Sequence, residues 1–190
     1  MNKLCQLFID TTANFCYVGI YNLKNKIDEI KIKVNKNVTD IIVESIWSLL
    51  EKNSLTYENI NELYLNIGPG SFTGVRVGVL IAKAWSNINQ TINIFAIDSL
   101  LLQTTVNNSI SIIDAKSNKS YLAIYQNFKP IQAPNIYNNV DIRQIIANHK
   151  ELIVFENQTD KSYDNFIFHK NHFKPIRVED LQPLYIKLPL

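Results

Sequence analysis

The chain has few of the residue types that build metal centres, disulfide frameworks or flexible linkers. Its 190 residues include two cysteines, three histidines and five glycines, and 19 basic residues nearly balance 17 acidic ones. The two cysteines, Cys5 and Cys16, lack CxxC spacing, which excludes a disulfide framework and indicates buried thiols in a reducing compartment. A net charge of +2 is too small to indicate nucleic-acid binding by itself.

Long apolar runs are also missing. None reaches the ~20 residues that a membrane-spanning helix needs, and Met1-Asn2-Lys3 enters a strand pattern directly, without a leader. We therefore expect a cytoplasmic globular protein with no membrane partner. The histidines, His149, His169 and His172, lie late in the chain without a cluster of acidic ligands nearby, so we predict surface side chains and no metal site.

Glycine is concentrated in one run. Three of the five glycines lie between an apolar strand pattern over 63–67 and an apolar helix pattern over 74–88, in the segment Gly68-Pro69-Gly70-Ser71-Phe72-Thr73-Gly74-Val75-Arg76. Pro69 and Gly70 fit the centre of a type II turn with positive φ at Gly70, and Thr73 is placed to cap the helix. Free N–H groups at such a helix start suit an anion, a nucleotide or a carboxylate of a partner. A loop that only turns tightly is an equal alternative.

The same run differs from the common phosphate-binding motifs. A Walker loop needs Gly-Lys-Ser/Thr where this chain has Thr73-Gly74-Val75, so the cation that grips the phosphates is missing. Arg76 in the first helical turn opposes the helix dipole by roughly 0.3–1 kcal/mol. That position favours an acidic partner, although a solvated arginine also tolerates the cost.

Two segments, 8–21 and 112–125, match without gaps at an offset of 104 residues. Six of the fourteen aligned pairs are identical, including Asp10 with Asp114, where ordinary residue usage gives roughly one. Each segment is an apolar strand ending in Asp, a polar turn and a second strand, which is typical of a β-hairpin. An offset near half the chain predicts two related lobes.

Hydrophobic periodicity predicts the order βββαβαβ for a first lobe over residues 1–105, followed by a shortened second lobe over residues 106–190. In the first lobe we expect strands at 3–9, 16–21, 27–34, 63–67 and 93–97 and helices at 39–53 and 74–88. In the second lobe we expect strands at 109–114, 121–126, 131–136 and 151–155 and a helix at 139–149. A connecting helix is expected over 99–106, and the tail from residue 156 lacks a long helix pattern.

Both long helices of the first lobe have apolar surfaces wider than one sheet covers, because an ordinary surface helix needs a stripe of only about 100°. Small residues recur every four positions in the second helix, and apolar residues widen the arc of the first. We predict that these residues form one partner-binding surface: Val43, Trp47, Gly74, Gly78, Ala82 and Trp85. Packing of the two helices on each other within the lobe is the alternative. A large apolar patch seldom stays solvated, so we also expect a homodimer when the chain is alone.

Three short segments are distinctive. They are Ile9-Asp10-Thr11-Thr12 after the first strand, the run over residues 68–78, and Ile113-Asp114-Ala115-Lys116 with Tyr121 in the second lobe. Together they resemble the bacterial TsaB (YeaZ) family over residues 1–126. Beyond that point the likeness is thin, apart from a closing Leu184-Tyr185-Ile186-Lys187. The resemblance implies a two-lobe actin-like α/β fold, the duplicated ribonuclease-H-like fold of actin, Hsp70 and sugar kinases.

The resemblance also implies a role in making threonylcarbamoyladenosine in tRNA. It implies a subunit without catalytic residues of its own, which pairs with a TsaD-type catalytic paralogue and is joined by a TsaE-type ATPase. We expect no cofactor to bind tightly to the chain alone. ATP or ADP is expected only at the partner interface, and tRNA only through the complex.

The first hairpin supports the non-catalytic interpretation. Active members of the wider fold place a glycine just after the first Asp so that backbone can approach a phosphate, and here Thr11 and Thr12 fill that space. We therefore interpret Asp10, Thr11, Thr12 and Asp114 as vestigial phosphate-turn positions, with both aspartates more typical of turn caps than of magnesium ligands. The alternative is a weak ATPase or phosphotransferase that uses Asp10, Thr11 and Asp114.

Overall fold

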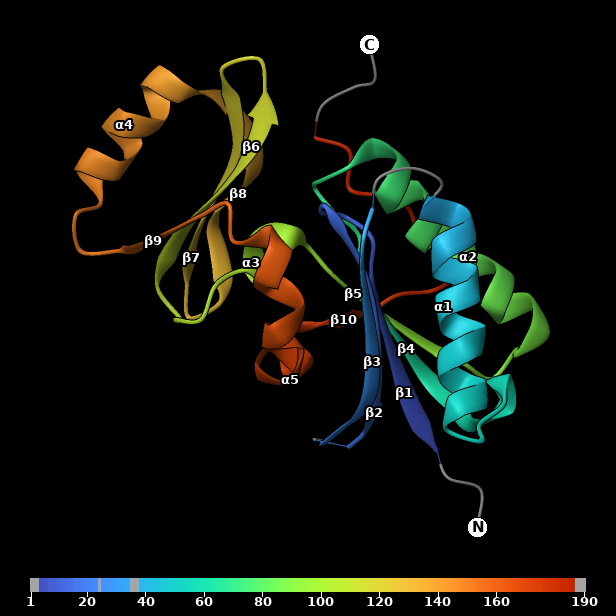
Figure 1. The fold of residues 1–190 in the computed structure, drawn as a ribbon. Coiled ribbons are helices and arrows are strands. Elements are labelled where there is room, and N and C mark those ends of the chain that lie inside the picture. Colours follow the sequence, from blue (N-terminus) through green and yellow to red (C-terminus); the bar gives the residue numbers. More distant parts are fainter. Residues whose placement is uncertain (1–3, 24, 35–37, 187–190) are drawn as a thin grey trace.

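The first lobe is built on a six-stranded sheet. The computed structural model describes residues 4–23, 25–34 and 38–186, and the strand order of this sheet is β10-β5-β4-β1-β2-β3 (Figure 1). Antiparallel pairing joins β1 to β2 and β2 to β3, whereas β4 pairs in parallel with β1 and with β5. The strands are β1 (Cys5–Asp10), β2 (Phe15–Asn22), β3 (Asn25–Lys33), β4 (Ile60–Asn66), β5 (Asn93–Ile97) and β10 (Lys174–Pro175).

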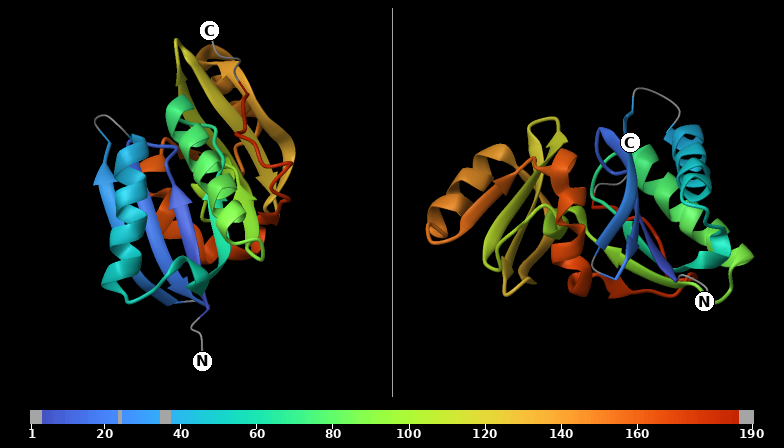
Figure 2. Two further views of the ribbon diagram at one scale, coloured as in Figure 1. Left: turned by 90° about the vertical axis from the view of Figure 1, so that its right-hand side faces the viewer. Right: turned by 60° about the horizontal axis from the view of Figure 1, so that its bottom comes forward.

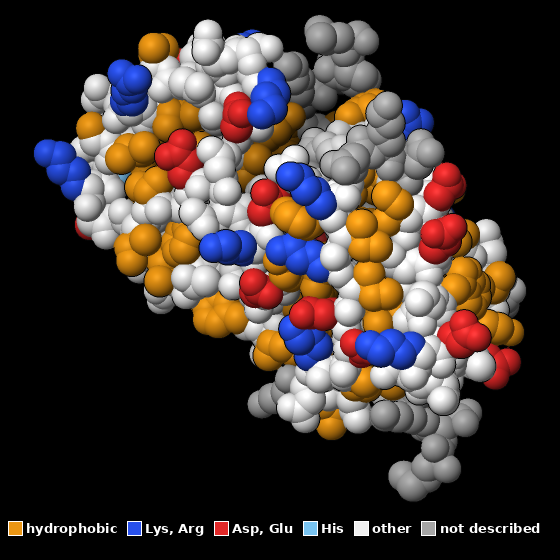
Figure 3. Space-filling model, viewed as in Figure 1, with side chains coloured by type: hydrophobic (Ala, Val, Ile, Leu, Met, Phe, Trp, Pro, Cys, Tyr) orange, Lys and Arg blue, Asp and Glu red, His pale blue; other side chains and the backbone are white. Residues whose placement is uncertain are grey.

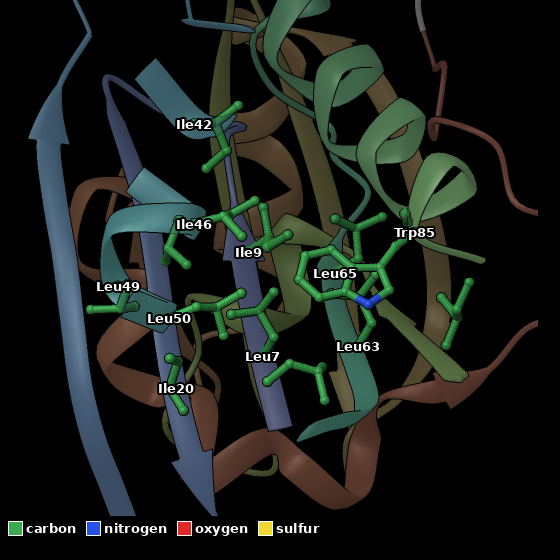
Figure 4. Packing of buried hydrophobic residues seen from close by; sticks show 14 of the residues in the cluster. Leu7, Ile9, Ile20, Ile42, Ile46, Leu49, Leu50, Leu63, Leu65 and Trp85 are labelled. Carbon is green, nitrogen blue, oxygen red and sulfur yellow. The ribbon is translucent and has the colours of Figure 1, made fainter. Parts of the chain in front are cut away.

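Two helices cover one face of this sheet, α1 (Val38–Lys52) and α2 (Phe72–Ile88), and they lie side by side (Figure 2). Their inward side chains meet those of the central strands, as Ile46 and Leu49 of α1 do with Leu7 and Ile9 of β1 (Figure 4). All of these side chains are at most 3% exposed. Burying one such side chain contributes roughly 1.5–3 kcal/mol, so the apolar periodicity fixes which face of each helix turns inward.

The second lobe repeats this plan with fewer strands. Its sheet has the order β8-β7-β6-β9, and the hairpin β6–β7 occupies the place of β1–β2 in the first sheet. The elements are β6 (Ser109–Lys116), β7 (Lys119–Gln126), β8 (Lys129–Asn138), α4 (Asn139–Asn148) and β9 (Ile153–Glu156). The two-lobe α/β arrangement is therefore confirmed, and among the described residues this sheet has no counterpart of β5.

The tail returns to the first lobe, although the sequence assigned it to the second. It forms η2 (Thr159–Asn165), α5 (Phe166–His169) and η3 (Lys170–His172), and then β10, which pairs with β5. The ring of Phe166 stacks on Phe8 at 4.7 Å, and that of Tyr163 stacks on Tyr17 at 4.5 Å. These aromatic side chains cover the face of the sheet opposite α1 and α2, so both faces of β1 are buried.

Two expectations about the connections are wrong. The helix between the lobes, α3, covers only Ser99–Leu102, because Thr104 turns back and its Oγ1 donates to Leu101 O at 2.9 Å. His169 is fully buried, not on the surface, and its Nε2 lies 2.7 Å from Thr104 O. Burial lowers the pKa of His169 to about 4. Of the closing segment of the sequence, Lys187 lies outside the described residues.

None of the described helices is long and apolar enough to cross a membrane.

The covering role of the tail gives a direct prediction. Phe166→Ala is expected to lower the free energy of unfolding by roughly 3–5 kcal/mol, because it opens a cavity among buried rings. Phe168→Ala is the matched control, since the Phe168 side chain is 50% exposed and two positions away. Urea unfolding followed by circular dichroism measures both. Equal midpoints for the two variants would contradict the packing of the tail on β1.

Candidate functional site

The turn after β1 is held by its own carboxylate. Asp10 Oδ1 accepts hydrogen bonds from Thr12 N at 2.9 Å and from Thr12 Oγ1 at 2.8 Å. Its Oδ2 accepts one from Asn66 Nδ2 at 2.9 Å, and Ser162 Oγ lies 3.4 Å from the same oxygen. Burial raises the pKa of Asp10, although these donors act in the opposite direction. Both carboxylate oxygens are therefore engaged inside the protein.

The next residues of this turn pack directly on the glycine loop. Ser71 N donates to Thr12 O at 2.8 Å, and Thr11 Oγ1 donates to Gly74 O at 2.7 Å. A Cβ at Gly70 would lie 2.3 Å from Thr12 O, and a Cβ at Gly74 would lie 1.8 Å from Thr11 O. Side-chain carbons do not approach a carbonyl oxygen so closely, so the backbone of the first turn requires glycine at both positions.

The turn inside the loop differs from the predicted one. The positive φ angle belongs to Gly68, at +99°, and not to Gly70. The Gly68-Pro69 peptide bond is cis. Gly70 is required by its closeness to Thr12, a contact between distant parts of the chain that a local turn pattern does not reveal.

The start of α2 also differs. The helix begins at Phe72 with Ser71 as its N-cap, and Ser71 Oγ accepts from Gly74 N at 3.3 Å. Thr73 lies inside the first turn and does not cap it. The hydrogen bond from Ser71 N to Thr12 O fixes Ser71 just before the helix, which gives it the capping position.

A cleft of about 610 Å³ lies between the lobes, where the two hairpins end. Thr12 and Ser71 line it from the first lobe, and Asp114 and Lys116 line it from the second. Asp114 accepts hydrogen bonds from Lys116 N and Lys116 Nζ, both at 2.8 Å, which lower its pKa. Asp10 is only 2% exposed and is not among the lining residues. The structure therefore does not bring the two aspartates together as a pair facing one space.

Metal ligands are not clustered in this cleft. No group of three or more His, Cys, Asp or Glu side chains is placed to hold a metal ion within residues 4–23, 25–34 and 38–186.

The outer surface of the first lobe is formed by α1 and α2. Val43 and Trp47 of α1 are 40% and 49% exposed, and the ring of Trp47 stacks on Trp85 at 6.4 Å. We call the exposed side chains of α1 and α2 the α1–α2 face. Val43 and Trp47 of the predicted interface lie on this face.

The small-residue stripe of α2 does not lie on the surface, which corrects the prediction. The four predicted interface residues that are buried within the lobe are Gly74, Gly78, Ala82 and Trp85. A Cβ at Gly78 would lie 2.9 Å from Thr11 Oγ1 and 3.2 Å from Leu65 Cδ1. The stripe thus allows α2 to approach β1, β4 and the first turn, so close packing is used inside the chain.

Other residues take the outward positions of α2. Leu80 is 62% exposed, and Arg76 lies over the ring of Phe72 at 5.2 Å. Phe72 in turn contacts Tyr185 at 5.6 Å, beside a groove of about 430 Å³ between α2 and the tail. Sequence reasoning missed Leu80, although its position four residues after Arg76 on the polar side of the helix indicates exposure.

Comparison with known proteins gives one family and several relatives. Residues 31–157 match the family described as "TsaD: tRNA N6-adenosine threonylcarbamoyltransferase". An uncharacterised protein of Mycoplasma genitalium is 30% identical over 97% of this chain and 96% of its own length. The tRNA threonylcarbamoyladenosine biosynthesis protein TsaB of Bacillus subtilis is 27% identical over 92% of this chain and 75% of its own length.

A solved structure gives the fold. An uncharacterised Pseudomonas aeruginosa protein similar to YeaZ aligns with TM-score 0.74 and 14% identity, over 97% of this chain and 100% of that one. The molecule is thus a protein of the two-lobe actin-like α/β class. The chain belongs to the TsaB (YeaZ) family, within the group that the TsaD family model recognises.

Docking of the first turn on the glycine loop predicts a graded effect of adding one methyl group. Gly74→Ala is expected to lower the free energy of unfolding by roughly 1–3 kcal/mol, because the clash with Thr11 O outweighs the better helix propensity of alanine. Gly78→Ala is the control and should cost less, since its Cβ meets only the ends of side chains. Urea unfolding measures both variants. A Gly74→Ala variant as stable as the parent would contradict this docking.

Proposed function

We propose that this chain is a non-catalytic scaffold subunit that pairs with a TsaD-type catalytic paralogue for threonylcarbamoylation of adenosine in tRNA, in the cytoplasm. The observation that carries the proposal is the α1–α2 face, where Trp47 remains 49% exposed above the buried Trp85. Half-exposed aromatic side chains are frequent anchors of protein interfaces. The TsaB-named relatives and the matched TsaD family support the choice of reaction and partner.

The first turn supports a role without catalysis. Thr11 and Thr12 occupy the space after Asp10, and their backbone oxygens are covered by Gly70 and Gly74. Asp10 is buried and bonded to four donor groups of the chain. A phosphate would have to displace these contacts before it reached the carboxylate.

The partners and cofactor follow the same proposal. A TsaE-type ATPase joins the pair, tRNA binds only through the complex, and the isolated chain forms a homodimer. No nucleotide binds tightly to the chain alone, and ATP or ADP is held at the interface with the paralogue. Arg76 at the edge of the α1–α2 face is the described cation that best suits an anion or a carboxylate there.

Pairing through this face predicts a specific loss of affinity. Trp47→Ala is expected to weaken binding to the purified TsaD-type paralogue at least tenfold, because it removes a large apolar anchor. Ile131→Ala is the matched control, since Ile131 is 59% exposed on β8 of the other lobe. Isothermal titration calorimetry measures both. If Trp47→Ala binds like the control, the pairing surface lies elsewhere.

The cleft beside Asp114 favours a second candidate, a weak ATPase or phosphotransferase, and kinetics separate the two. We expect the isolated chain with ATP and magnesium to release phosphate no faster than buffer, because Asp10 does not reach the cleft. Asp114→Asn is the test variant, since its side chain is exposed and its loss leaves the core intact. Steady turnover by the parent that Asp114→Asn abolishes would replace the scaffold proposal with the ATPase.

A further inference from the structure

The charges of the α1–α2 face are separated by helix. The exposed acidic side chains of α1 are Asp40, Glu44 and Glu51, and the basic side chains of α2 are Arg76 and Lys83. The only basic residue of α1, Lys52, already pairs with Asp28 of β3 at 2.7 Å. In the part of the chain that the structure describes, the ion pairs include none of these five side chains.

The spacing turns these charges into two ridges. Asp40, Glu44 and Glu51 are four and seven residues apart, so they follow one line along α1, and Arg76 and Lys83 are seven apart along α2. The helices lie side by side on the same side of the sheet (Figure 2). Red acidic side chains accordingly follow the right-hand edge of the molecule, where α1 lies in Figure 1 (Figure 3).

Apolar side chains accompany these two ridges. Val43 and Trp47 stand one residue from the acidic line of α1, and Leu80 lies between Arg76 and Lys83. The face therefore combines an apolar seam with one negative and one positive border. Such a surface needs a partner with the opposite order of charges.

A second copy of this chain has that order when it is turned by a two-fold axis. We propose that the α1–α2 face binds a second copy in a two-fold arrangement, with α1 of each copy against α2 of the other. Acidic and basic ridges then meet twice, because every contact of a two-fold interface is repeated. An arrangement with α1 against α1 would instead place carboxylates against carboxylates and is disfavoured.

The inference rests on the proposed function in one respect, namely that this face is used for protein pairing. It goes further in fixing which helices meet and in assigning the charges as the cause. The self-association it describes covers Trp47 and so competes with the paralogue for the same surface.

Charge exchange between two variants tests the arrangement. One variant carries Glu44→Lys with Glu51→Lys, and the other carries Arg76→Glu with Lys83→Glu. Each alone brings like charges together at both copies of the contact, so sedimentation equilibrium at low salt should show the dimer at least tenfold weaker. An equimolar mixture should recover the parental affinity, because each helix of one variant then meets opposite charges on the other.

The controls keep the outcomes distinct. Lys129→Glu with Lys150→Glu reverses two exposed charges of the second lobe and should leave self-association unchanged. Circular dichroism checks that every variant is folded, and the single changes Glu44→Lys and Arg76→Glu serve if a double variant is not.

Three results would overturn the proposal: a parent that remains monomeric, variants that associate like the parent, or a mixture no tighter than its components. The calorimetric test of Trp47→Ala with the paralogue is independent of these results. Failure of the charge exchange with a clear effect of Trp47→Ala rejects the two-fold arrangement and retains the pairing face. No effect of Trp47→Ala on paralogue binding rejects the pairing face itself.

Discussion

The backbone contact between the first turn and the glycine loop constrains the position of α2. Thr11 O and Thr12 O lie where a side chain at Gly74 or Gly70 would have to be. Because these contacts involve the backbone at the N-terminal end of α2, they fix the rotation of the helix as well as its distance from β1. A helix with 3.6 residues per turn that directs Gly74 and Gly78 inward must direct Arg76 and Leu80 outward. The composition of the α1–α2 face thus follows from packing in the interior.

The tail locks the same turn from the other side of the sheet. Ser162 approaches Asp10, and Asn165 Nδ2 donates to Leu102 O at 3.0 Å near the junction of the lobes. The stacked rings of Tyr163 and Tyr17 add contact area that is insensitive to salt. The first lobe is consequently completed by residues that follow the second lobe in the sequence.

Much of the fold could be predicted because its strands and long helices carry strong periodicity. The first hairpin and the one containing Asp114 were recognisable as a repeat, and the structure places them at equivalent positions. The direction of the α2 stripe was not predictable, because glycine is suited both to a helix partner and to the backbone of a distant turn. The tail was assigned to the wrong lobe, since aromatic residues at irregular spacing, such as Tyr163 and Phe166, indicate burial without indicating the surface they cover.

The two regions with distinctive motifs therefore have different roles. The turn and the glycine loop use their hydrogen-bonding groups on each other, which stabilises the fold and leaves little free polarity for a substrate. The α1–α2 face keeps apolar area in water, and covering the exposed half of a tryptophan of ~200 Å² would release roughly 2–3 kcal/mol. Association can recover that free energy without any change in the fold. The motif that identifies the family builds the scaffold, and the adjacent helices present the surface available for binding.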